Sequence, residues 1–331
     1  MTTETLGPVA VLGAGNMGTA LAQQIARNGH HVRAWSIERD VLDEIRDSHL
    51  NTKYLKGIPL DHRIDAVSEI GDAIQGATLL VVSVPSQVVA TVAADIGKHA
   101  TSGQIILNVA KGIYKGRRMS EVLSDALSNE TDAIVGSLGG PAIAIELAAN
   151  VPTAVIVGIS DDAASSTVQS LLQNDSLKVQ ITADVTGLEL CSSMKNVYAI
   201  ALGMCDGLGF GTNTKAFLAN VALEEMAAIC TGAGGLQETA YGLAGIGDLL
   251  TTGFSQHSRN RTLGEKMGSS GDWEQFAESN TVEGIEACKA IRDLTHGSGH
   301  KTHLLDTIYE ALFLDRSPED AIRHFFSDFA Y

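Results

Sequence analysis

A glycine-rich loop close to the N-terminus limits the possible folds of this chain more than any other feature. Gly13, Gly15 and Gly18 directly follow the apolar run Val9–Leu12 and precede Thr19–Asn28, a stretch with helical character. At this spacing the first glycine permits a tight turn, the second lets the backbone approach a pyrophosphate, and the third allows close helix–strand packing. The pyrophosphate then lies at the positive end of the helix. The pattern therefore predicts a dinucleotide site, with a ligand-free glycine turn as the alternative.

Short β-branched runs alternate with helical patterns through the first half of the chain. Such alternation is typical of parallel βαβ units in a doubly wound sheet. The strands that we expect are Val9–Leu12, His31–Trp35, Thr78–Val84, Gln104–Val109, Ala133–Leu138, Thr153–Gly158 and Lys178–Ile181. The helices that we expect are Thr19–Asn28, Val88–His99, Met119–Ser128 and Asp161–Leu172.

The strand signal fades from about Gly187 onward, and only helical patterns remain. The helices expected there are Leu188–Met204, Thr214–Cys230, Gly242–Thr252, Arg261–Met267, Glu283–Leu294, Lys301–Leu312 and Pro318–Phe326. The sequence therefore predicts an α/β fold class, with an N-terminal doubly wound, Rossmann-type parallel sheet followed by an all-α C-terminal domain. We expect the first domain to span residues 1–184 and the second to span residues 185–331.

The composition excludes several classes of protein. A chain of 331 residues with 44% hydrophobic residues is too large for one simple core and too apolar for disorder. Its net charge of −16 disfavours nucleic acid or an anionic membrane as a partner, and its apolar runs are shorter than the ~20 residues of a membrane helix. The four cysteines form no CxxC pair, which disfavours a disulfide scaffold or a zinc site. Since the segment Met1–Pro8 also lacks signal-peptide features, we expect a soluble cytoplasmic protein without a metal.

The residues after the second predicted strand bear on the choice between NAD and NADP. An acid about 20 residues beyond the loop would hold the 2′-hydroxyl of NAD, and a nearby Arg would accept the 2′-phosphate of NADP. Ser36 occupies the position where the acid is expected. Glu38 would suit NAD and Arg39 would suit NADP, but either is equally compatible with a solvated surface charge. The sequence supports NAD or NADP without a choice between them.

A lysine stands inside an otherwise apolar helical stretch in the second half, as Lys195 followed by Asn196. Burial of a Lys is costly unless the side chain faces a wet or charged cleft. A desolvated Lys has a lowered pKa and can exchange protons near neutral pH. A lysine whose ammonium reaches the helix surface is the alternative.

Two further polar groups follow along the chain. Asp248 lies in a glycine-rich turn that opens a helix, where an ordinary N-cap is the alternative. Ser258, Arg259, Asn260 and Arg261 form a compact donor cluster whose guanidinium groups match phosphate oxygens; a solvated basic turn is the alternative. Together with the glycine loop, these residues suggest hydride transfer to a small phosphorylated carbonyl compound.

The chain resembles the NAD(P)-dependent sn-glycerol-3-phosphate dehydrogenases, from about Val9 into its last helices. The Lys-Asn helix, the aspartate turn and the SRNR sequence, in this order, are more specific than the glycine loop. The segments that carry the resemblance are GAGNMGTALA, NTKYLKGIPL, SVPS, AKGI, GGPAIAIELA, PTAVIVG, MKNVYAIALGMCDGLGFGTNTKA, GLAGIGDLLTT, SRNR and TVEGIEA.

The resemblance implies the reversible reduction of dihydroxyacetone phosphate to sn-glycerol 3-phosphate, a precursor of glycerophospholipids. It implies that Lys195 is the catalytic acid/base, and that Asn196 and Asp248 orient Lys195 and the substrate hydroxyls. It implies that Lys111, in the segment AKGI, helps to bind both substrate and cofactor. We also expect a homodimer.

The resemblance further implies a set of binding residues. For the substrate phosphate they are Ser258, Arg259 and Asn260, with Arg259 also near the cofactor. For the region of the substrate and the nicotinamide they are Gly140 and Ala144. For the dinucleotide they are Asn16, Met17 and Glu283, beside Gly13, Gly15 and Gly18.

The chain departs from the family pattern at several positions. These are Ala142, where a Ser or Asn is usual, Ala90 and Asn220–Val221, where an Arg and a Thr-Arg pair are common, and Ile37, where a basic residue is frequent. None of them changes Lys195, Asp248 or Arg259. A glycerol-3-phosphate dehydrogenase is therefore the leading hypothesis. Ala142 and Ala90 suggest a second one, a paralogue that acts on another small phosphorylated ketone or hydroxy acid. A third, a catalytically weak nucleotide-binding protein, would require loss of the lysine or the arginine cluster, and both are present.

Overall fold

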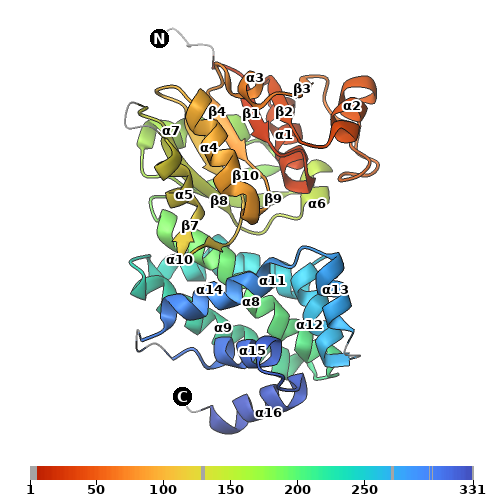
Figure 1. Ribbon diagram of the computed structural model, residues 1–331, viewed down its shortest axis with the longest axis vertical. Coiled ribbons are helices and arrows are strands. Elements are labelled where there is room, and N and C mark those ends of the chain that lie inside the picture. The colour runs from red at the N-terminus through yellow and green to blue at the C-terminus, as the bar shows by residue number, and fades with distance from the viewer. Residues whose placement is uncertain (1–5, 128–130, 270–271, 298, 300, 330–331) are drawn as a thin grey trace. The chain divides into compact units, whose positions relative to one another are not determined.

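The computed structural model describes residues 6–127, 131–269, 272–297, 299 and 301–329, which form two compact units (Figure 1). The first unit contains the chain up to Ala110 and Met119–Val185, and the second contains Lys111–Arg118 and the chain from Thr186 onward. The predicted domain limits differ from these units mainly because residues 111–118 belong to the second one. The start of the segment Met1–Pro8, residues 1–5, lies outside the described residues.

The first unit contains an eight-stranded sheet in the order β10-β9-β8-β5-β4-β1-β2-β3. Its strands are β1 (Val9–Leu12), β2 (Val32–Trp35), β3 (Ile64–Val67), β4 (Leu79–Val82), β5 (Ile105–Asn108), β8 (Ile134–Gly139), β9 (Thr153–Gly158) and β10 (Leu177–Thr182). The predicted α/β class with a doubly wound sheet is confirmed. In this order β1 is followed by β2 on one side, and β4 is followed by β5 on the other side. The strand order therefore reverses between β1 and β4, and sheets of this kind bind ligands at the carboxyl ends of the strands at such a switch point.

The sheet is not parallel throughout, and this corrects the prediction. Strands β8 and β9 pair antiparallel, so that β9 and its parallel neighbour β10 run opposite to the other six strands. The connection between β8 and β9 contains only one short helix, α6 (Ala144–Ala148). Parallel neighbours usually need a longer crossover helix, whereas antiparallel neighbours accept short connections.

Helices cover both faces of this sheet. They are α1 (Asn16–Arg27), α2 (Arg39–Ser48), α3 (Ile70–Ile74), α4 (Val89–His99), α5 (Met119–Ala126), α6 and α7 (Asp162–Leu172). The sequence analysis missed α2, α3, α6 and β3, because these elements are short or strongly polar. Ser128, the predicted end of the helix that corresponds to α5, lies outside the described residues.

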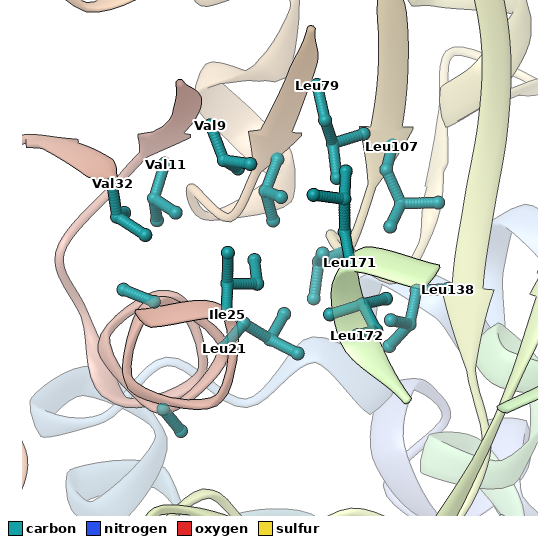
Figure 2. Close-up of a cluster of buried hydrophobic side chains, with 14 of the residues drawn as sticks. Val9, Val11, Leu21, Ile25, Val32, Leu79, Leu107, Leu138, Leu171 and Leu172 are labelled. Carbon is teal, nitrogen blue, oxygen red and sulfur yellow. The ribbon is translucent and has the colours of Figure 1, made fainter. Parts of the chain in front are cut away.

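The core of the first unit explains why its strands read as continuous apolar runs. Val9 and Val11 point into a cluster that contains Leu21 and Ile25 of α1 (Figure 2). Leu12 lies outside this cluster and is nevertheless fully buried. Because alternate side chains face opposite sides, the strand is buried on both faces, as in most parallel sheets.

Among the described residues of the second unit, the secondary structure is helical except for one hairpin. Its helices are α8 (Val185–Gly207), α9 (Thr212–Gly232), α10 (Gln237–Tyr241), α11 (Asp248–Phe254), α12 (Arg259–Ser269), α13 (Trp273–Ser279), α14 (Glu283–Thr295), α15 (His303–Phe313) and α16 (Pro318–Asp328). The hairpin, β6 (Ile113–Tyr114) and β7 (Arg117–Arg118), lies outside the predicted all-α range 185–331, in which the described residues form helices and no strand. Its turn residues Lys115 and Gly116 both have positive φ, the geometry that suits a two-residue hairpin loop.

Helices α8 and α12 approach each other unusually closely. A Cβ on Gly203 of α8 would lie 2.0 Å from the carbonyl oxygen of Arg261, and a Cβ on Gly264 of α12 would lie 2.0 Å from that of Ile200. The glycines therefore allow the start of α12 to lie against the helix that carries Lys195. No helix in the described ranges has both the length and the apolar character to cross a membrane.

Candidate active site

The glycine loop of the first unit has the geometry that the sequence predicts. Gly13 has a φ of +111°, and a Cβ there would lie 2.5 Å from the carbonyl oxygen of Ser83, just after β4. A Cβ on Gly18 would lie 1.9 Å from the carbonyl oxygen of Gly13. A Cβ on Gly15 would meet nothing within 4 Å. Two glycines thus allow close packing at the switch point, and the third leaves open space next to the backbone.

The open space lies at the start of α1. Gly15 is the N-cap of this helix and provides no capping side chain, and the first turn carries no acid. The backbone N–H groups of Asn16 and Met17 have no partner within the helix, because the first hydrogen bond of α1 is donated by Thr19 to Gly15. These groups and the helix dipole fit the pyrophosphate of a dinucleotide.

Asn51 braces the glycine loop, and the sequence analysis did not identify it. The fully buried Asn51 donates through Nδ2 to the carbonyl oxygen of Ala14 at 2.9 Å and to Thr19 Oγ1 at 2.9 Å. Thr19 Oγ1 donates to the same carbonyl at 3.1 Å. Asn51 is the polar first residue of the segment NTKYLKG, and this feature of the sequence could have identified it.

Gly140 and Ala144 both lie in the first unit, beyond β8. Gly140 follows the strand directly with a φ of +99°, a conformation that favours glycine. Ala144 is the first residue of α6 and is buried in the hydrophobic core. Arg39 is the exposed first residue of α2.

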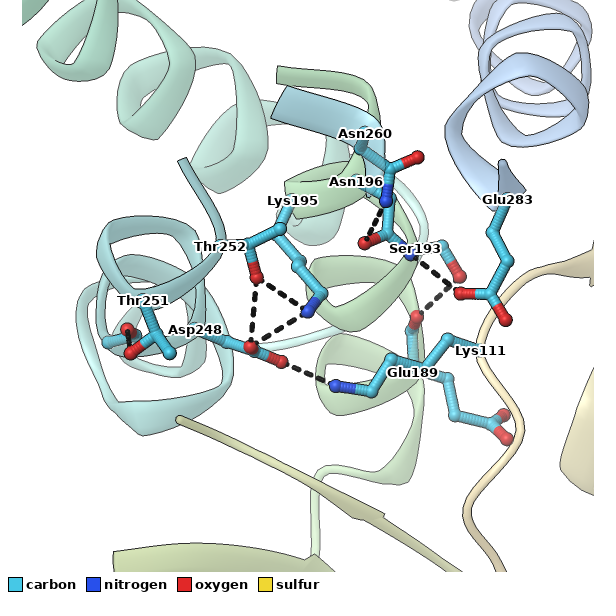
Figure 3. Close-up of polar contacts among 11 residues, drawn as sticks. Lys111, Glu189, Ser193, Lys195, Asn196, Asp248, Thr251, Thr252, Asn260 and Glu283 are labelled. Carbon is cyan, nitrogen blue, oxygen red and sulfur yellow. Dashed lines mark hydrogen bonds and ion pairs between the residues drawn. The ribbon is translucent and has the colours of Figure 1, made fainter. Parts of the chain in front are cut away.

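The second unit brings two lysines onto one carboxylate (Figure 3). Lys195 Nζ lies 2.8 Å from Asp248 Oδ1 and donates to Thr252 Oγ1 at 2.7 Å. Lys111 Nζ lies 2.6 Å from Asp248 Oδ2. The side chain of Asp248 is 3% exposed, that of Lys195 is 9% exposed and that of Lys111 is 20% exposed. The site therefore holds two positive charges and one negative charge largely away from water.

Local structure explains how Asp248 reaches both lysines. Lys195 lies in α8, Lys111 lies in the loop before the hairpin, and Asp248 begins α11 after a π-helical turn, Leu243–Gly247. Within that turn a Cβ on Gly245 would lie 1.9 Å from the carbonyl oxygen of Ala240, so only glycine fits. The ordinary N-cap alternative for Asp248 is excluded, because its side chain binds the two lysines.

The charges in this cluster shift one another's pKa values. Burial lowers the pKa of Lys195 to about 8; the Asp248 carboxylate opposes this shift, and the charge of Lys111 adds to it. Burial would also lower the pKa of Lys111, but the Asp248 carboxylate outweighs burial and raises it. Burial would raise the pKa of Asp248, but the two lysines hold it below its usual range. Lys195 is thus the group able to exchange a proton near neutral pH.

Asn196 and Asn260 belong to a second, adjoining network. Asn196 Nδ2 donates to Glu283 Oε2 at 3.1 Å, and Asn196 Oδ1 accepts from Asn260 Nδ2 at 3.0 Å. Asn260 Oδ1 in turn accepts from the backbone N–H of Gly284 at 2.9 Å. The two asparagines therefore connect the starts of α12 and α14 to the helix that carries Lys195.

The two arginines of the SRNR sequence have different surroundings. Arg261 donates through Nε to Asp206 Oδ2 at 2.8 Å and pairs with Glu265, and its side chain is 11% exposed. Arg259 is the exposed first residue of α12 and forms no ion pair in the part of the chain that the structure describes. Ser258 Oγ accepts from the backbone N–H of Arg261 at 3.2 Å. Arg259 is thus the available cation at this helix start, and Arg261 is a structural residue.

Thr252 is a site residue that the sequence analysis did not single out. It accepts from Lys195, and its hydroxyl oxygen lies 3.3 Å from Asp248 Oδ1. Its position four residues after Asp248 places both side chains on one face of α11, and this spacing was the available signal. Among the described residues, no group of three or more His, Cys, Asp or Glu side chains could hold a metal ion.

These observations define a class of protein, the nicotinamide-dependent dehydrogenases. One unit carries a dinucleotide loop, and the other carries a lysine of lowered pKa beside a positively charged helix start. The chain belongs to the NAD-dependent glycerol-3-phosphate dehydrogenase family: residues 8–165 match its N-terminal part and residues 184–323 match its C-terminal part. The predicted family, the enzyme class and the use of NAD or NADP are therefore confirmed.

Individual relatives agree with this membership. The glycerol-3-phosphate dehydrogenase, NAD(P)+, of Staphylococcus aureus strain JH9 is 37% identical over 319 residues, which cover 95% of this chain and 96% of that protein. The crystal structure of glycerol-3-phosphate dehydrogenase from Coxiella burnetii has a TM-score of 0.90 at 32% identity and covers 97% of this chain and 99% of that one. The corresponding Saccharomyces cerevisiae structure, with a TM-score of 0.86 at 24% identity over 97% of this chain and 99% of that one, shows the fold alone.

Proposed function

We propose that this chain reversibly reduces dihydroxyacetone phosphate to sn-glycerol 3-phosphate with NADH or NADPH, and so supplies a precursor of glycerophospholipids. The observation that carries this proposal is Lys195, a buried lysine with a pKa of about 8 held by Asp248 and Thr252. When bound, the nicotinamide supplies the hydride. The residues proposed to hold the dinucleotide are Gly13, Gly15, Asn16, Met17, Gly18, Arg39, Lys111, Ala144, Arg259 and Glu283.

Lys195 is proposed as the acid/base of the reaction. In the direction of reduction its ammonium group donates a proton to the substrate oxygen as the carbonyl becomes a hydroxyl, and the neutral amine then regains a proton from solvent. In the direction of oxidation the neutral amine removes the hydroxyl proton. Asp248 and Thr252 orient the amine, and Lys111 stabilises the negative charge that develops on the oxygen.

The substrate phosphate is proposed to bind at the start of α12. Arg259 is an exposed cation there, and the N-terminal backbone amides of this eleven-residue helix favour an anion. The Ser258 oxygen accepts from the backbone N–H of Arg261, and its hydroxyl hydrogen has no acceptor among the described residues. Asn260 supports the site through Asn196. Gly140 is a further residue proposed to bind the substrate.

Arg259→Ala tests this assignment. A charge-assisted contact is worth about 1.5–3 kcal/mol, so kcat/KM for dihydroxyacetone phosphate should fall by at least ~10-fold. The loss for unphosphorylated dihydroxyacetone should be much smaller, because that substrate never makes the contact. Both are measured at saturating coenzyme, and equal losses would assign Arg259 to the cofactor or the fold. Glyceraldehyde 3-phosphate in the same assay distinguishes the paralogue hypothesis.

We further propose that the chain acts as a cytoplasmic homodimer. Its four cysteines are buried and form no disulfide, which suits a reducing compartment. Tyr241 is 49% exposed and Leu250 is 44% exposed, and apolar surface of this kind suits contact with a second copy. Light scattering at several protein concentrations tests the oligomeric state, and a mass of one chain throughout would contradict it.

A further inference from the structure

A compact cluster of side chains surrounds the end of β2 in the first unit. Glu38, the residue before α2, accepts from Lys53 Nζ at 2.5 Å through Oε1 and from Tyr54 OH at 2.6 Å through Oε2. Lys53 also lies 3.6 Å from Asp40 Oδ2. The function proposed above leaves Glu38, Lys53 and Tyr54 without a role.

The segment that carries Lys53 and Tyr54 links this cluster to the glycine loop. At its start Asn51 donates to the carbonyl oxygen of Ala14. The backbone N–H of Leu55 donates to the carbonyl oxygen of Asn51 at 2.7 Å, and the Leu55 side chain is buried in the core. In a dinucleotide-binding sheet the adenosine ribose lies between the glycine loop and the end of the second strand. Glu38 and Lys53 therefore border the place of the ribose.

Glu38 offers an acceptor to a neutral ribose. The Lys53 ammonium and then the Tyr54 hydroxyl hold the pKa of Glu38 below its usual range, so the carboxylate is ionised. Each of its oxygens receives one protein donor and has a second lone pair, which can accept a 2′-hydroxyl. Ser36, which occupies the usual acid position, already accepts the backbone N–H of Glu38 at 3.1 Å.

Lys53 offers a donor to a 2′-phosphate. Its side chain is 47% exposed, and an ion pair this accessible to water contributes little stability. The ammonium can therefore leave Glu38 for a phosphate at small cost. Without that movement the Glu38 carboxylate would repel the phosphate dianion.

We propose that Glu38 and Lys53 form an exchangeable ion pair that distinguishes the coenzymes at the 2′ position of the adenosine ribose. Glu38 accepts the 2′-hydroxyl of NAD(H), and Lys53 moves to pair with the 2′-phosphate of NADP(H). The inference rests on the dinucleotide role of the glycine loop, and it gives Lys53 the part that the sequence assigned to Arg39. The chain then uses both coenzymes with a modest preference.

The experiment measures binding rather than turnover. Calorimetric titration of the full-length protein with ADP-ribose and with its 2′-phosphate gives two dissociation constants for each variant. Lys53→Met should weaken binding of the 2′-phosphate by at least ~10-fold and leave ADP-ribose almost unchanged. Glu38→Gln should act in the opposite sense, with weaker ADP-ribose and tighter 2′-phosphate binding. Lys56→Met, an exposed lysine of the same segment, is the matched control for the loss of one positive charge.

Several outcomes would overturn the proposal. Equal losses of affinity for both probes in Lys53→Met would mean that Lys53 has only a general electrostatic or structural role. A lowered melting temperature of the variant would identify the structural role. A loss of 2′-phosphate binding in Arg39→Ala, with none in Lys53→Met, would return the contact to Arg39. If the unmodified protein bound neither probe, the dinucleotide site itself would fail, and the proposed function with it.

Discussion

Two buried carboxylates of the helical unit have opposite pKa shifts. Taken as whole residues, Asp248 is 2% exposed and Glu225 is 5% exposed, so burial alone would raise the pKa of each. Asp248 lies against two ammonium groups, and its pKa falls. Glu225 accepts from Tyr198 OH at 2.9 Å and from the backbone N–H groups of Leu304 and Leu305 at 2.7 and 3.1 Å. With no cation paired to it in the described residues, burial raises the pKa of Glu225 to about 7.

The difference separates the carboxylate that we propose to act in catalysis, Asp248, from a structural one, Glu225. Glu225, on α9, supplies the N-terminal cap that α15 lacks, since the side chain of Thr302 does not cap that helix. Asp248 instead holds two lysines of unequal pKa at the start of a helix. Burial of a carboxylate does not by itself indicate a site; the groups that contact it decide whether it takes part in chemistry.

Of the proposed substitutions, removal of the Lys195 amine, which Asp248 holds, should have the largest effect on activity. Lys195→Ala should lower kcat by at least ~100-fold, a usual scale for loss of a general acid, with little change in coenzyme affinity. Steady-state kinetics and coenzyme titration check both. Lys289→Ala is the matched control, since Lys289 pairs with Glu286 at the surface and lies over the ring of Phe313, outside the proposed site. A near-normal kcat in Lys195→Ala would contradict the assignment of Lys195 as the acid/base.

On the structural side, Glu225→Ala should reduce stability rather than activity. Three buried donors, including the fully buried Tyr198 hydroxyl, lose their acceptor. The expected loss is about 2–3 kcal/mol in the free energy of unfolding, measured by urea denaturation. Tyr198→Phe, which removes one donor and leaves the cap of α15 in place, should cost less. If Glu225→Ala instead lowered kcat as Lys195→Ala does, the two carboxylates would not differ in role.

The pH dependence should show the smallest effect and tests the coupling within the Asp248 cluster. Reduction needs the protonated Lys195, so its rate should fall as the pH rises through about 8, whereas oxidation should rise over the same range. Lys111→Met removes a charge that lowers the pKa of Lys195, and both transitions should move to higher pH. The position of the transition is the readout, because the maximal rate also reflects substrate binding. A transition that stays in place would mean that Lys111 does not act on Lys195.

Local features of this chain could be predicted from its sequence. Strands β1 and β9 have the predicted bounds, Val9–Leu12 and Thr153–Gly158, because buried β-branched runs between turn residues have few alternatives. The glycine loop was predictable for the same kind of reason, since Gly13 requires a positive φ and Gly18 a close approach. Lys195 could be identified as unusual from its apolar neighbours alone.

Tertiary structure decided which of these residues meet. No local pattern indicates that Lys111 and Lys195 share Asp248, or that residues 111–118 leave the sheet for the helical unit. Arg259 and Arg261 belong to the same SRNR sequence, and nothing in that sequence distinguishes their roles. Only Arg261 is held by Asp206, because the glycines of α8 and α12 bring these helices together. Periodicity and turn chemistry act over a few neighbouring residues. The charge, exposure and pKa of a site depend on contacts between segments far apart in the chain, and those contacts exist only in the folded protein.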